Sequence, residues 1–196
     1  MSDVLVLYYS RHGATAALAR EVGRGVDSVP GMAARLRTVP RVSSTIEASE
    51  DPIPDSGPPF ATARDLAESA GLIMGSPARF GNMAASLKYF LDGTAGEWLA
   101  GSAAGKPAAV FTSTSSLHGG QETTLLTMAL PLLHHGMLFV GLPYTEDDLR
   151  TTTTGGTPYG ATHVSRNRKV ATLSDEEKRL ARALGRRVAD IASRLG

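Results

Sequence analysis

An unbroken apolar run near the start of the chain, Val4 to Tyr9, constrains the fold more than any other feature. Its apolar residues are consecutive rather than alternating, which is typical of a strand covered on both faces, as in a parallel sheet. Similar runs recur, each ending at Ser, Gly or Pro, at Leu72 to Met74, Ala108 to Phe111 and Met137 to Val140, with a weaker run at Ala33 to Val39. The sequence therefore predicts a sheet of five parallel strands.

Helical patterns separate these runs. Leu18, Val22 and Val26 recur every four residues, which places them on one face of a helix. The last pattern begins where Ser174 and Glu177 have the spacing of a capping box. Strands that alternate with helices are typical of a doubly wound α/β sheet, and a chain of 196 residues with 42% hydrophobic content is long enough for one core. We therefore expect a single α/β domain over residues 1–196.

Two segments interrupt this alternation and are predicted to be long loops. Residues 40–61 hold five prolines, too many for regular structure. Residues 151–170 begin with TTTTGGTPYGAT, which has the composition of a loop. Loops of this length in a compact domain more often carry function than serve as plain connections.

The charge and the cysteine content argue against several classes of function. A formal net charge of +1 gives no field that favours nucleic acid or a membrane surface, and no apolar stretch reaches the ~20 residues that a membrane span needs. The absence of Cys removes disulfides and thiolate metal sites and fits a reducing compartment, so we expect a cytoplasmic protein. The five His residues lack the H-E-x-x-H spacing of a zinc site, and we expect no metal.

The segment YYSRHGATAALAR, residues 8–20, carries the first candidate site. It turns from a buried strand into a helix through polar residues, at the sheet edge where doubly wound folds bind ligands. It lacks both the Gly-Lys-Ser/Thr of a P-loop and the G-x-G-x-x-G of a dinucleotide site. The hydroxyls of Ser10 and Thr15, with the amides of the first helical turn, suit one terminal phosphate, which favours a mononucleotide such as FMN. The alternative is that Ser10 only caps the helix and that His12 is exposed.

Two further polar loops follow predicted strands and so reach the same edge. GSPARFGNM, after the third strand, holds Pro77, Arg79, Phe80 and Asn82 ahead of a helix. FTSTSSLHGGQE, after the fourth strand, holds five Ser or Thr in succession. A hydroxyl run of this kind is also typical of a solvated turn. Three polar loops at one edge nevertheless favour a common binding site.

The motifs in these loops resemble those of a known family. LVLYYSRHGAT, GSPARFGNM, GGQE, HHGM and GGTPYGA occur in order and at matching spacing between residue 4 and about residue 163. Together they resemble the motifs of the WrbA-type NAD(P)H:quinone oxidoreductases. The resemblance implies a flavodoxin-like fold with strand order 2-1-3-4-5, FMN as cofactor, NAD(P)H as co-substrate and quinones as substrates. It also implies a homotetramer whose active sites are built partly from neighbouring subunits.

The resemblance assigns site residues to this chain. Cofactor contacts fall on Ser10, Arg11, His12, Gly13, Ala14 and Thr15, on Pro77, Ala78, Arg79 and Phe80, on Ser113, Thr114, Ser115, Ser116 and Gly119, and on His134. The backbone amides of the second group suit the polar edge of the flavin ring. Substrate contacts fall on His12, Phe80 and Trp98, of which Phe80 and Trp98 form apolar walls. His134 is the implied catalytic residue, because it lies beside the flavin and is able to stabilise negative charge there.

Two positions depart from the family pattern: His12 stands where a tyrosine is usual, and Ala78 replaces a threonine. The implied reaction is a ping-pong transfer of two electrons from NAD(P)H to FMN and then to a quinone. Arg11, at the mouth of the site, is suited to the extra phosphate of NADPH. Two alternatives remain, a one-electron carrier of the flavodoxin type, whose usual acidity this chain lacks, and a regulatory binding protein, for which no nucleic-acid motif is present.

Overall fold

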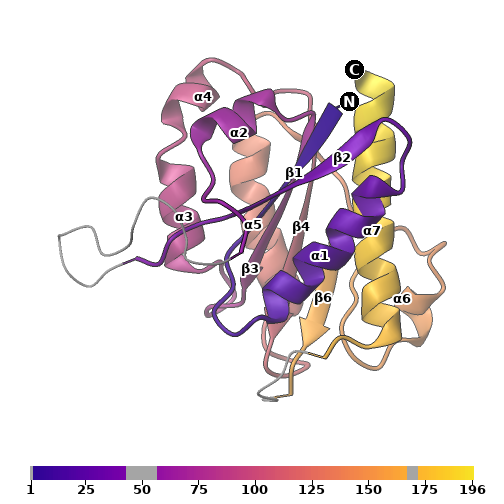
Figure 1. The fold of residues 1–196 in the computed structure, drawn as a ribbon. Helices are drawn as coiled ribbons and strands as arrows, with labels where there is room; N and C mark the ends of the chain where they lie inside the picture. Colours follow the sequence, from indigo (N-terminus) through magenta and orange to yellow (C-terminus); the bar gives the residue numbers. More distant parts are fainter. Residues whose placement is uncertain (1, 43–56, 167–171) are drawn as a thin grey trace.

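The computed structural model describes residues 2–42, 57–166 and 172–196 and shows a parallel sheet between two layers of helices (Figure 1). In these ranges the strands are β1 (Ser2–Tyr8), β2 (Met32–Thr38), β3 (Gly71–Pro77), β4 (Pro107–Thr114), β5 (Leu138–Phe139) and β6 (Ala161–Val164). The helices are α1 (Ala14–Asp27), α2 (Ala63–Glu68), α3 (Ala85–Asp92), α4 (Ala95–Leu99), α5 (Gln121–His134), α6 (Asp148–Thr151) and α7 (Asp175–Leu195). The predicted strand order is confirmed, since the sheet runs β2-β1-β3-β4-β5.

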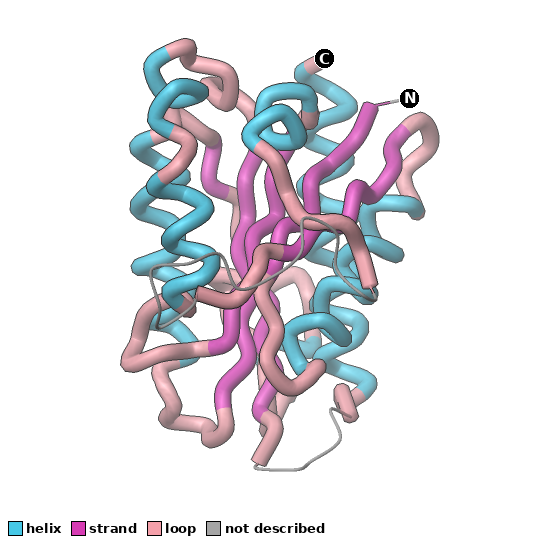
Figure 2. Tube along the Cα trace, turned by 60° about the vertical axis from the view of Figure 1, so that its left-hand side comes forward, coloured by secondary structure: helices cyan, strands magenta, loops and turns pink. Residues whose placement is uncertain are grey.

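The apolar run of β1 is explained by burial of both faces of the strand, as its pattern predicts. Val4 and Val6 belong to the cluster of buried side chains that β1 shares with α1 and α7. Leu5 and Leu7 point to the other face and belong to the cluster formed with α2, α3 and α5. Figure 2 shows the helices on both sides of the strands. Because both faces of β1 are covered, every position of the strand interior is apolar.

The sheet differs from the five-stranded prediction at one edge. Within the described residues it has six strands, because the two-residue β5 pairs with the start of β4 and β6 pairs with its end. β6 lies inside the segment 151–170, so the prediction of a loop over that whole segment was wrong. Its polar residues Thr162 and His163 are buried because Gln121 and Glu177 provide hydrogen-bond partners for them. Because these positions are polar, this part of the sequence lacks the apolar run that predicts a buried strand.

Two parts of the predicted loops, residues 43–56 and 167–171, lie outside the described residues. The loop prediction at 40–61 is therefore described only at its ends, where Phe60 forms an isolated parallel bridge with Thr38. Among the described helices, none has both the length and the apolar character required to cross a membrane.

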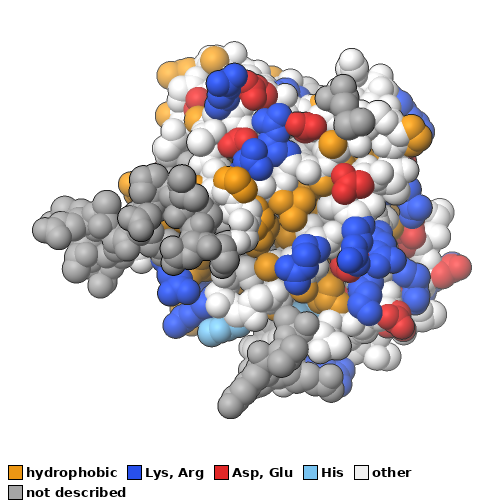
Figure 3. Space-filling view, viewed as in Figure 1, with side chains coloured by type: hydrophobic (Ala, Val, Ile, Leu, Met, Phe, Trp, Pro, Cys, Tyr) orange, Lys and Arg blue, Asp and Glu red, His pale blue; other side chains and the backbone are white. Residues whose placement is uncertain are grey.

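α1 and α7 pack closely on one face of the sheet, and glycines make the approach possible. A Cβ atom added at Gly185 would lie 2.0 Å from the carbonyl oxygen of Val22, and one added at Gly25 would lie 2.0 Å from that of Arg182. At the surface the same helices are joined by an ion pair of 2.6 Å between Arg182 and Glu21. Figure 3 shows side chains of both signs beside one another over this face. These contacts hold the second half of α1 against α7.

Candidate functional site

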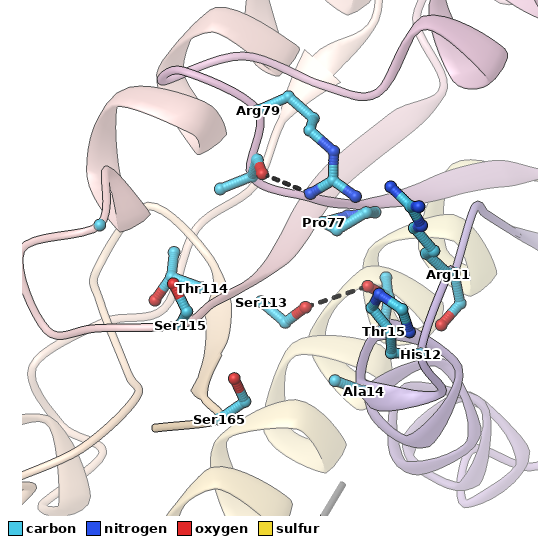
Figure 4. A pocket seen from close by; sticks show the side chains of 13 residues that line it. Arg11, His12, Ala14, Thr15, Pro77, Arg79, Ser113, Thr114, Ser115 and Ser165 are labelled. Carbon is cyan, nitrogen blue, oxygen red and sulfur yellow. Dashed lines mark hydrogen bonds between the residues drawn. The ribbon is translucent and has the colours of Figure 1, made fainter. Parts of the chain in front are cut away.

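A pocket of about 450 Å³ opens where β1, β3 and β4 end (Figure 4). The two chain termini lie at the opposite end of the molecule (Figure 1). All three loops singled out in the sequence line the pocket, which confirms that they meet at one edge of the sheet. One further residue, Ser165 after β6, completes the lining.

The loop between β1 and α1 forms one wall and contributes Ser10, Arg11, His12, Ala14 and Thr15. Gly13 is not in the lining but begins the helix at φ 87°, a left-handed conformation that favours glycine. Its N–H donates to Ser10 Oγ at 3.2 Å, and no side chain caps α1. The alternative in which Ser10 caps the helix is therefore wrong, although His12 is exposed.

Without a capping side chain, the first amides of α1 remain available to a ligand. The first N–H groups of any helix have no acceptor within the helix, and the helix dipole makes that end positive. The buried Thr15 hydroxyl lies 3.1 Å from that of Ser113 at the end of β4. An anion at this wall would meet amides and hydroxyls together, which is the usual donor set of a phosphate site at a helix N-terminus.

The loop after β4 forms the opposite wall, with Ser113, Thr114, Ser115 and Gly119 in the lining. Ser116 is not in the lining. Its carbonyl oxygen accepts hydrogen bonds from Thr114 Oγ1 at 2.8 Å and from the Gly119 N–H at 3.1 Å. Ser116 thus holds the shape of the loop from behind rather than facing the pocket.

The loop after β3 is held by a tight turn. Arg79 and Asn82 exchange two backbone hydrogen bonds of 2.8 and 3.0 Å around Phe80 at φ 53° and Gly81 at φ 75°. Two successive positive φ values define a type I′ turn, in which a bulky residue such as Phe80 is strained. Phe80 is fully exposed and does not line the pocket, whereas Pro77, Ala78 and Arg79 do.

Of the four residues whose backbone amides were predicted to suit the polar edge of a flavin ring, three have no N–H free to donate in this structure. Pro77 has no N–H group. The Ala78 N–H already donates to the carbonyl oxygen of Ser113 at 2.9 Å, and the Arg79 N–H donates to that of Asn82 at 2.8 Å. Backbone pairing with β4 and the turn itself use these donors. The Phe80 amide is the one left from the predicted set.

Ser165 reaches the pocket because a buried carboxylate fixes the strand before it. Glu177 Oε1 accepts from the backbone N–H groups of Val164 and Gly155 at 3.1 and 3.0 Å and from Thr154 Oγ1 at 2.8 Å. Its Oε2 lies 2.7 Å from His163 Nδ1. The capping box is confirmed at the same carboxylate, through the Ser174 N–H at 2.9 Å.

These hydrogen bonds determine the ionisation of Glu177. Burial alone would raise the pKa of this carboxyl, but the bonds from His163, Ser174 and Thr154 outweigh burial and lower the pKa to about 2. The carboxylate is therefore ionised at neutral pH, and His163 Nδ1 donates to it. The sequence motif suggested only a helix cap, and nothing in it indicated that Glu177 also anchors β6 and a lining residue of the pocket.

Trp98 and His134 lie beside each other, away from the first pocket. Trp98 Nε1 donates to the carbonyl oxygen of His134 at 2.8 Å, and both side chains line a separate pocket of about 470 Å³. α5 begins beside the first pocket and has 14 residues, so His134 at its far end is roughly 20 Å away along the helix. Within one chain, the structure does not bring either residue to the first pocket.

No metal centre was expected. Over the ranges 2–42, 57–166 and 172–196, no group of three or more His, Asp or Glu side chains is arranged to hold a metal ion.

Comparison with known proteins supports the family assignment. Residues 3–145 match the model of a family described as NADPH-dependent FMN reductase. A relative from Solidesulfovibrio magneticus, named NAD(P)H dehydrogenase (quinone), is 43% identical over 200 residues and covers 98% of each chain. A relative of the same name from Trichlorobacter lovleyi is 42% identical over 207 residues, covering 100% of this chain and 99% of its own.

Among solved structures, a WrbA-like flavodoxin protein from Agrobacterium tumefaciens has a TM-score of 0.71 at 24% identity and covers 99% of both chains. At this identity the likeness concerns the fold, and the flavodoxin-like fold implied by the motifs is confirmed. The family model and the two full-length relatives confirm the resemblance seen in the motifs. The chain belongs to the NADPH-dependent FMN reductase family.

Proposed function

We propose that this chain is an FMN-dependent NAD(P)H:quinone oxidoreductase. The names of its relatives support this activity. The observation that carries the proposal is the uncapped N-terminus of α1 beside the Thr15 and Ser113 hydroxyls, inside a pocket of about 450 Å³. That volume lies in the range of small-ligand sites, roughly 300 to 1,000 Å³.

The residues of the pocket fit FMN part by part. The phosphate would accept hydrogen bonds from the amides of the first turn of α1 and from the hydroxyls of Ser10 and Thr15. No Lys is needed, because the helix terminus supplies the positive potential. The flavin ring would lie between the loop at 77–80 and the loop at 113–119. Ser165 adds a hydroxyl at the side that β6 forms.

When bound, FMN supplies the redox chemistry, accepting a hydride from NAD(P)H and returning two electrons to a quinone. The protein positions the rings and excludes competing reactions. We propose ping-pong order, in which nicotinamide and quinone use one face of the flavin in turn, with Arg11, His12 and Arg79 among the residues that line the pocket. His12 is flat and exposed, so its ring is available to stack on a bound substrate.

We further propose that Trp98 and His134 complete the site of a neighbouring subunit in a homotetramer. The supporting observation is a broad set of exposed apolar side chains over α3, α4 and α5, namely Tyr89, Trp98, Leu99, Leu126, Leu130 and Leu133. An apolar surface of this kind is typical of an oligomer interface. In such an assembly His134 would stabilise negative charge on the reduced flavin or the quinone oxygen.

Steady-state kinetics test the proposal. FMN-loaded protein is assayed for NADH and NADPH oxidation with benzoquinone as acceptor, and both substrates are varied. The proposal predicts quinone-dependent turnover and parallel lines in double-reciprocal plots. Converging lines would contradict the ping-pong order alone, whereas the absence of quinone-dependent turnover would contradict the enzyme activity.

We also propose a cytoplasmic location, which the absence of Cys favours.

A further inference from the structure

The end of α5 is closed by backbone hydrogen bonds that leave one carbonyl group for another part of the chain. The N–H groups of residues 135–137 donate to the carbonyl oxygens of Pro131, Leu132 and Leu133 at 2.9 to 3.1 Å. The next carbonyl oxygen, that of His134, accepts from Trp98 Nε1 at 2.8 Å. The last carbonyl groups of a helix have no partner within the helix, so the indole of Trp98 supplies a donor that α5 itself lacks.

A second hydrogen bond joins α4 to the residue after His134. Thr94, the N-cap residue of α4, is buried, and its Oγ1 lies 3.0 Å from His135 Nε2. The backbone N–H of Trp98 donates to the carbonyl oxygen of Thr94 at 3.0 Å, so the two residues are one helical turn apart. All four residues line the pocket of about 470 Å³. α4, at the end of the molecule that holds the chain termini (Figure 1), is thus attached to the end of α5 at two points.

The direction of the hydrogen bond between Thr94 and His135 follows from the other bond of the same hydroxyl. Thr94 Oγ1 donates its one hydrogen to the carbonyl oxygen of Leu91 at 2.7 Å. The hydroxyl oxygen is therefore the acceptor for His135, and Nε2 of the imidazole carries a hydrogen. In the neutral ring the other nitrogen, Nδ1, is then unprotonated.

The imidazole of His135 is neutral at pH 7. Burial lowers the pKa of His135, while Glu97 of α4 raises this pKa and His134 lowers it by smaller amounts. Nδ1 is buried and has no hydrogen-bond partner in the part of the chain that the structure describes. A proton added there would place a charged N–H group where no acceptor faces it, which is costly. His135 therefore holds Thr94 as a neutral donor.

We propose that His135 is a positioning residue for the quinone reduction, because its bond to Thr94 fixes α4, and with it the Trp98 indole, against the end of α5 that carries His134. The inference rests on the proposed function, which assigns Trp98 and His134 to the flavin site of a neighbouring subunit. Trp98 is 50% exposed, and its single hydrogen bond to a carbonyl oxygen leaves the ring free to tilt. The bond one turn away, at Thr94, removes that freedom.

Two substitutions at His135 test the inference with FMN-loaded protein. The amide nitrogen of a Gln side chain reaches the place of Nε2, whereas that of Asn reaches only the place of Nδ1. We expect His135→Gln to keep kcat/KM for benzoquinone within about twofold of the wild type, and His135→Asn to lower it about tenfold. Affinity for FMN stays within about twofold in both variants, because His135 does not line the first pocket.

Substitutions of the acceptor give the same test from α4. Thr94→Val removes the hydroxyl with little change in volume and is expected to lower kcat/KM for benzoquinone about tenfold, whereas Thr94→Ser restores it. Trp98 is the only Trp of the chain, so its fluorescence reports the position of the indole directly. We expect the constant for acrylamide quenching to rise in Thr94→Val and His135→Asn and to return to the wild-type value in Thr94→Ser and His135→Gln.

The matched control is Thr157→Val. Thr157 is also buried, and its Oγ1 likewise donates to a carbonyl oxygen, that of Gly160, and accepts from an N–H, that of Tyr159. It lines neither the first pocket nor the pocket at Trp98, so its loss leaves Trp98 quenching unchanged. Equal effects of Thr157→Val and Thr94→Val on quenching and kinetics would assign both to general destabilisation and overturn the inference.

The remaining outcomes separate the inference from the proposed function. Wild-type quinone kinetics in Thr94→Val overturn the inference even where quenching rises, because Trp98 then moves without effect on the reaction. Equal kcat/KM values for His135→Gln and His135→Asn overturn it as well, since the Nε2 donor then has no role. Wild-type protein without quinone-dependent turnover overturns the proposed function, and the role of His135 falls with it.

Discussion

The hydroxyls of Thr15 and Ser113 lie 3.1 Å apart and join the first turn of α1 to the end of β4 (Figure 4). The two residues are 98 positions apart in the chain, and both are buried. Their contact fixes two walls of the pocket relative to each other. The hydroxyl that accepts in this pair keeps its own O–H, which it can donate to a bound phosphate, and both oxygens can still accept from a ribityl hydroxyl.

Thr15→Val removes this hydroxyl with little change in volume. We expect FMN affinity to fall about tenfold, because one hydrogen bond to a charged group is lost and Ser113 loses its partner. Quenching of flavin fluorescence on titration measures the affinity. Thr153→Val, at an exposed position outside the pocket, is the control and leaves the affinity unchanged. Equal affinity in Thr15→Val and the wild type would exclude this hydroxyl from the cofactor site.

Glu177→Gln tests the buried carboxylate that anchors β6. The pKa of the Glu177 carboxyl is about 2 in the folded protein and 4.5 when the chain is unfolded. Ionisation of this carboxyl therefore stabilises the fold above about pH 4.5. This stabilisation is lost as the pH falls from about 4.5 toward 2. We expect the variant to lose about 3 kcal/mol of unfolding free energy at pH 7, with a smaller difference from the wild type at pH 3.

Urea denaturation at several pH values measures this profile. Glu176→Gln, one position earlier and more exposed, is the matched control and changes the unfolding free energy by less than about 0.5 kcal/mol. A Glu177→Gln protein that loses the same free energy at pH 3 as at pH 7 would show that the carboxylate charge does not stabilise the fold.

Gly185→Ala tests the close packing of α1 and α7. The new Cβ would lie 2.0 Å from the Val22 carbonyl oxygen, so the helices must separate. We expect a loss of about 2 to 3 kcal/mol and a lower Tm. Gly96→Ala in α4, where no atom lies within 4 Å of the added Cβ, is neutral or stabilising by up to about 1 kcal/mol. Similar Tm values for the two variants would contradict the packing.

Mixed oligomers test whether His134 acts on a neighbouring subunit. His134→Ala retains FMN and lowers kcat/KM for the quinone at least about tenfold. Ser10→Asp places a carboxylate against the phosphate and abolishes FMN binding while leaving His134 intact. When the two impaired proteins are unfolded, mixed and refolded together, hybrids unite an intact FMN site with an intact His134.

We expect the activity of the refolded mixture to exceed the sum of the two separately refolded variants. Mixed wild-type and Ser10→Asp protein is the control for refolding yield. Activity no greater than the sum would mean that His134 does not act across subunits, and full activity of His134→Ala alone would remove it from the reaction.

Much of this fold was predictable because its physical cause is local. The apolar run of β1 and the spacing of Leu18, Val22 and Val26 reflect burial of β1 on both faces and of α1 on one, and both predictions are confirmed. β6 was missed because His163 and Thr162 are polar, and only the distant Glu177 and Gln121 make their burial favourable.

The residues of the site divide in the same way, into those that the local sequence predicts and those that depend on distant parts of the chain. The loop residues of the pocket follow strands directly, so their meeting at one edge was predictable. Ser165 depends on the position of β6, and the engaged amides of Ala78 and Arg79 depend on the pairing with β4 and on the turn at Phe80. The long distance of His134 from the pocket follows from the length of α5, which a motif alone does not reveal.

Titration of the apoprotein with FMN and with riboflavin tests the central claim most directly, because the two ligands differ only in the terminal phosphate. If the amides at the start of α1 and the hydroxyls of Ser10 and Thr15 bind that phosphate, FMN binds at least about a hundredfold more tightly than riboflavin. Equal affinity for the two ligands, or no binding of FMN, would contradict the account.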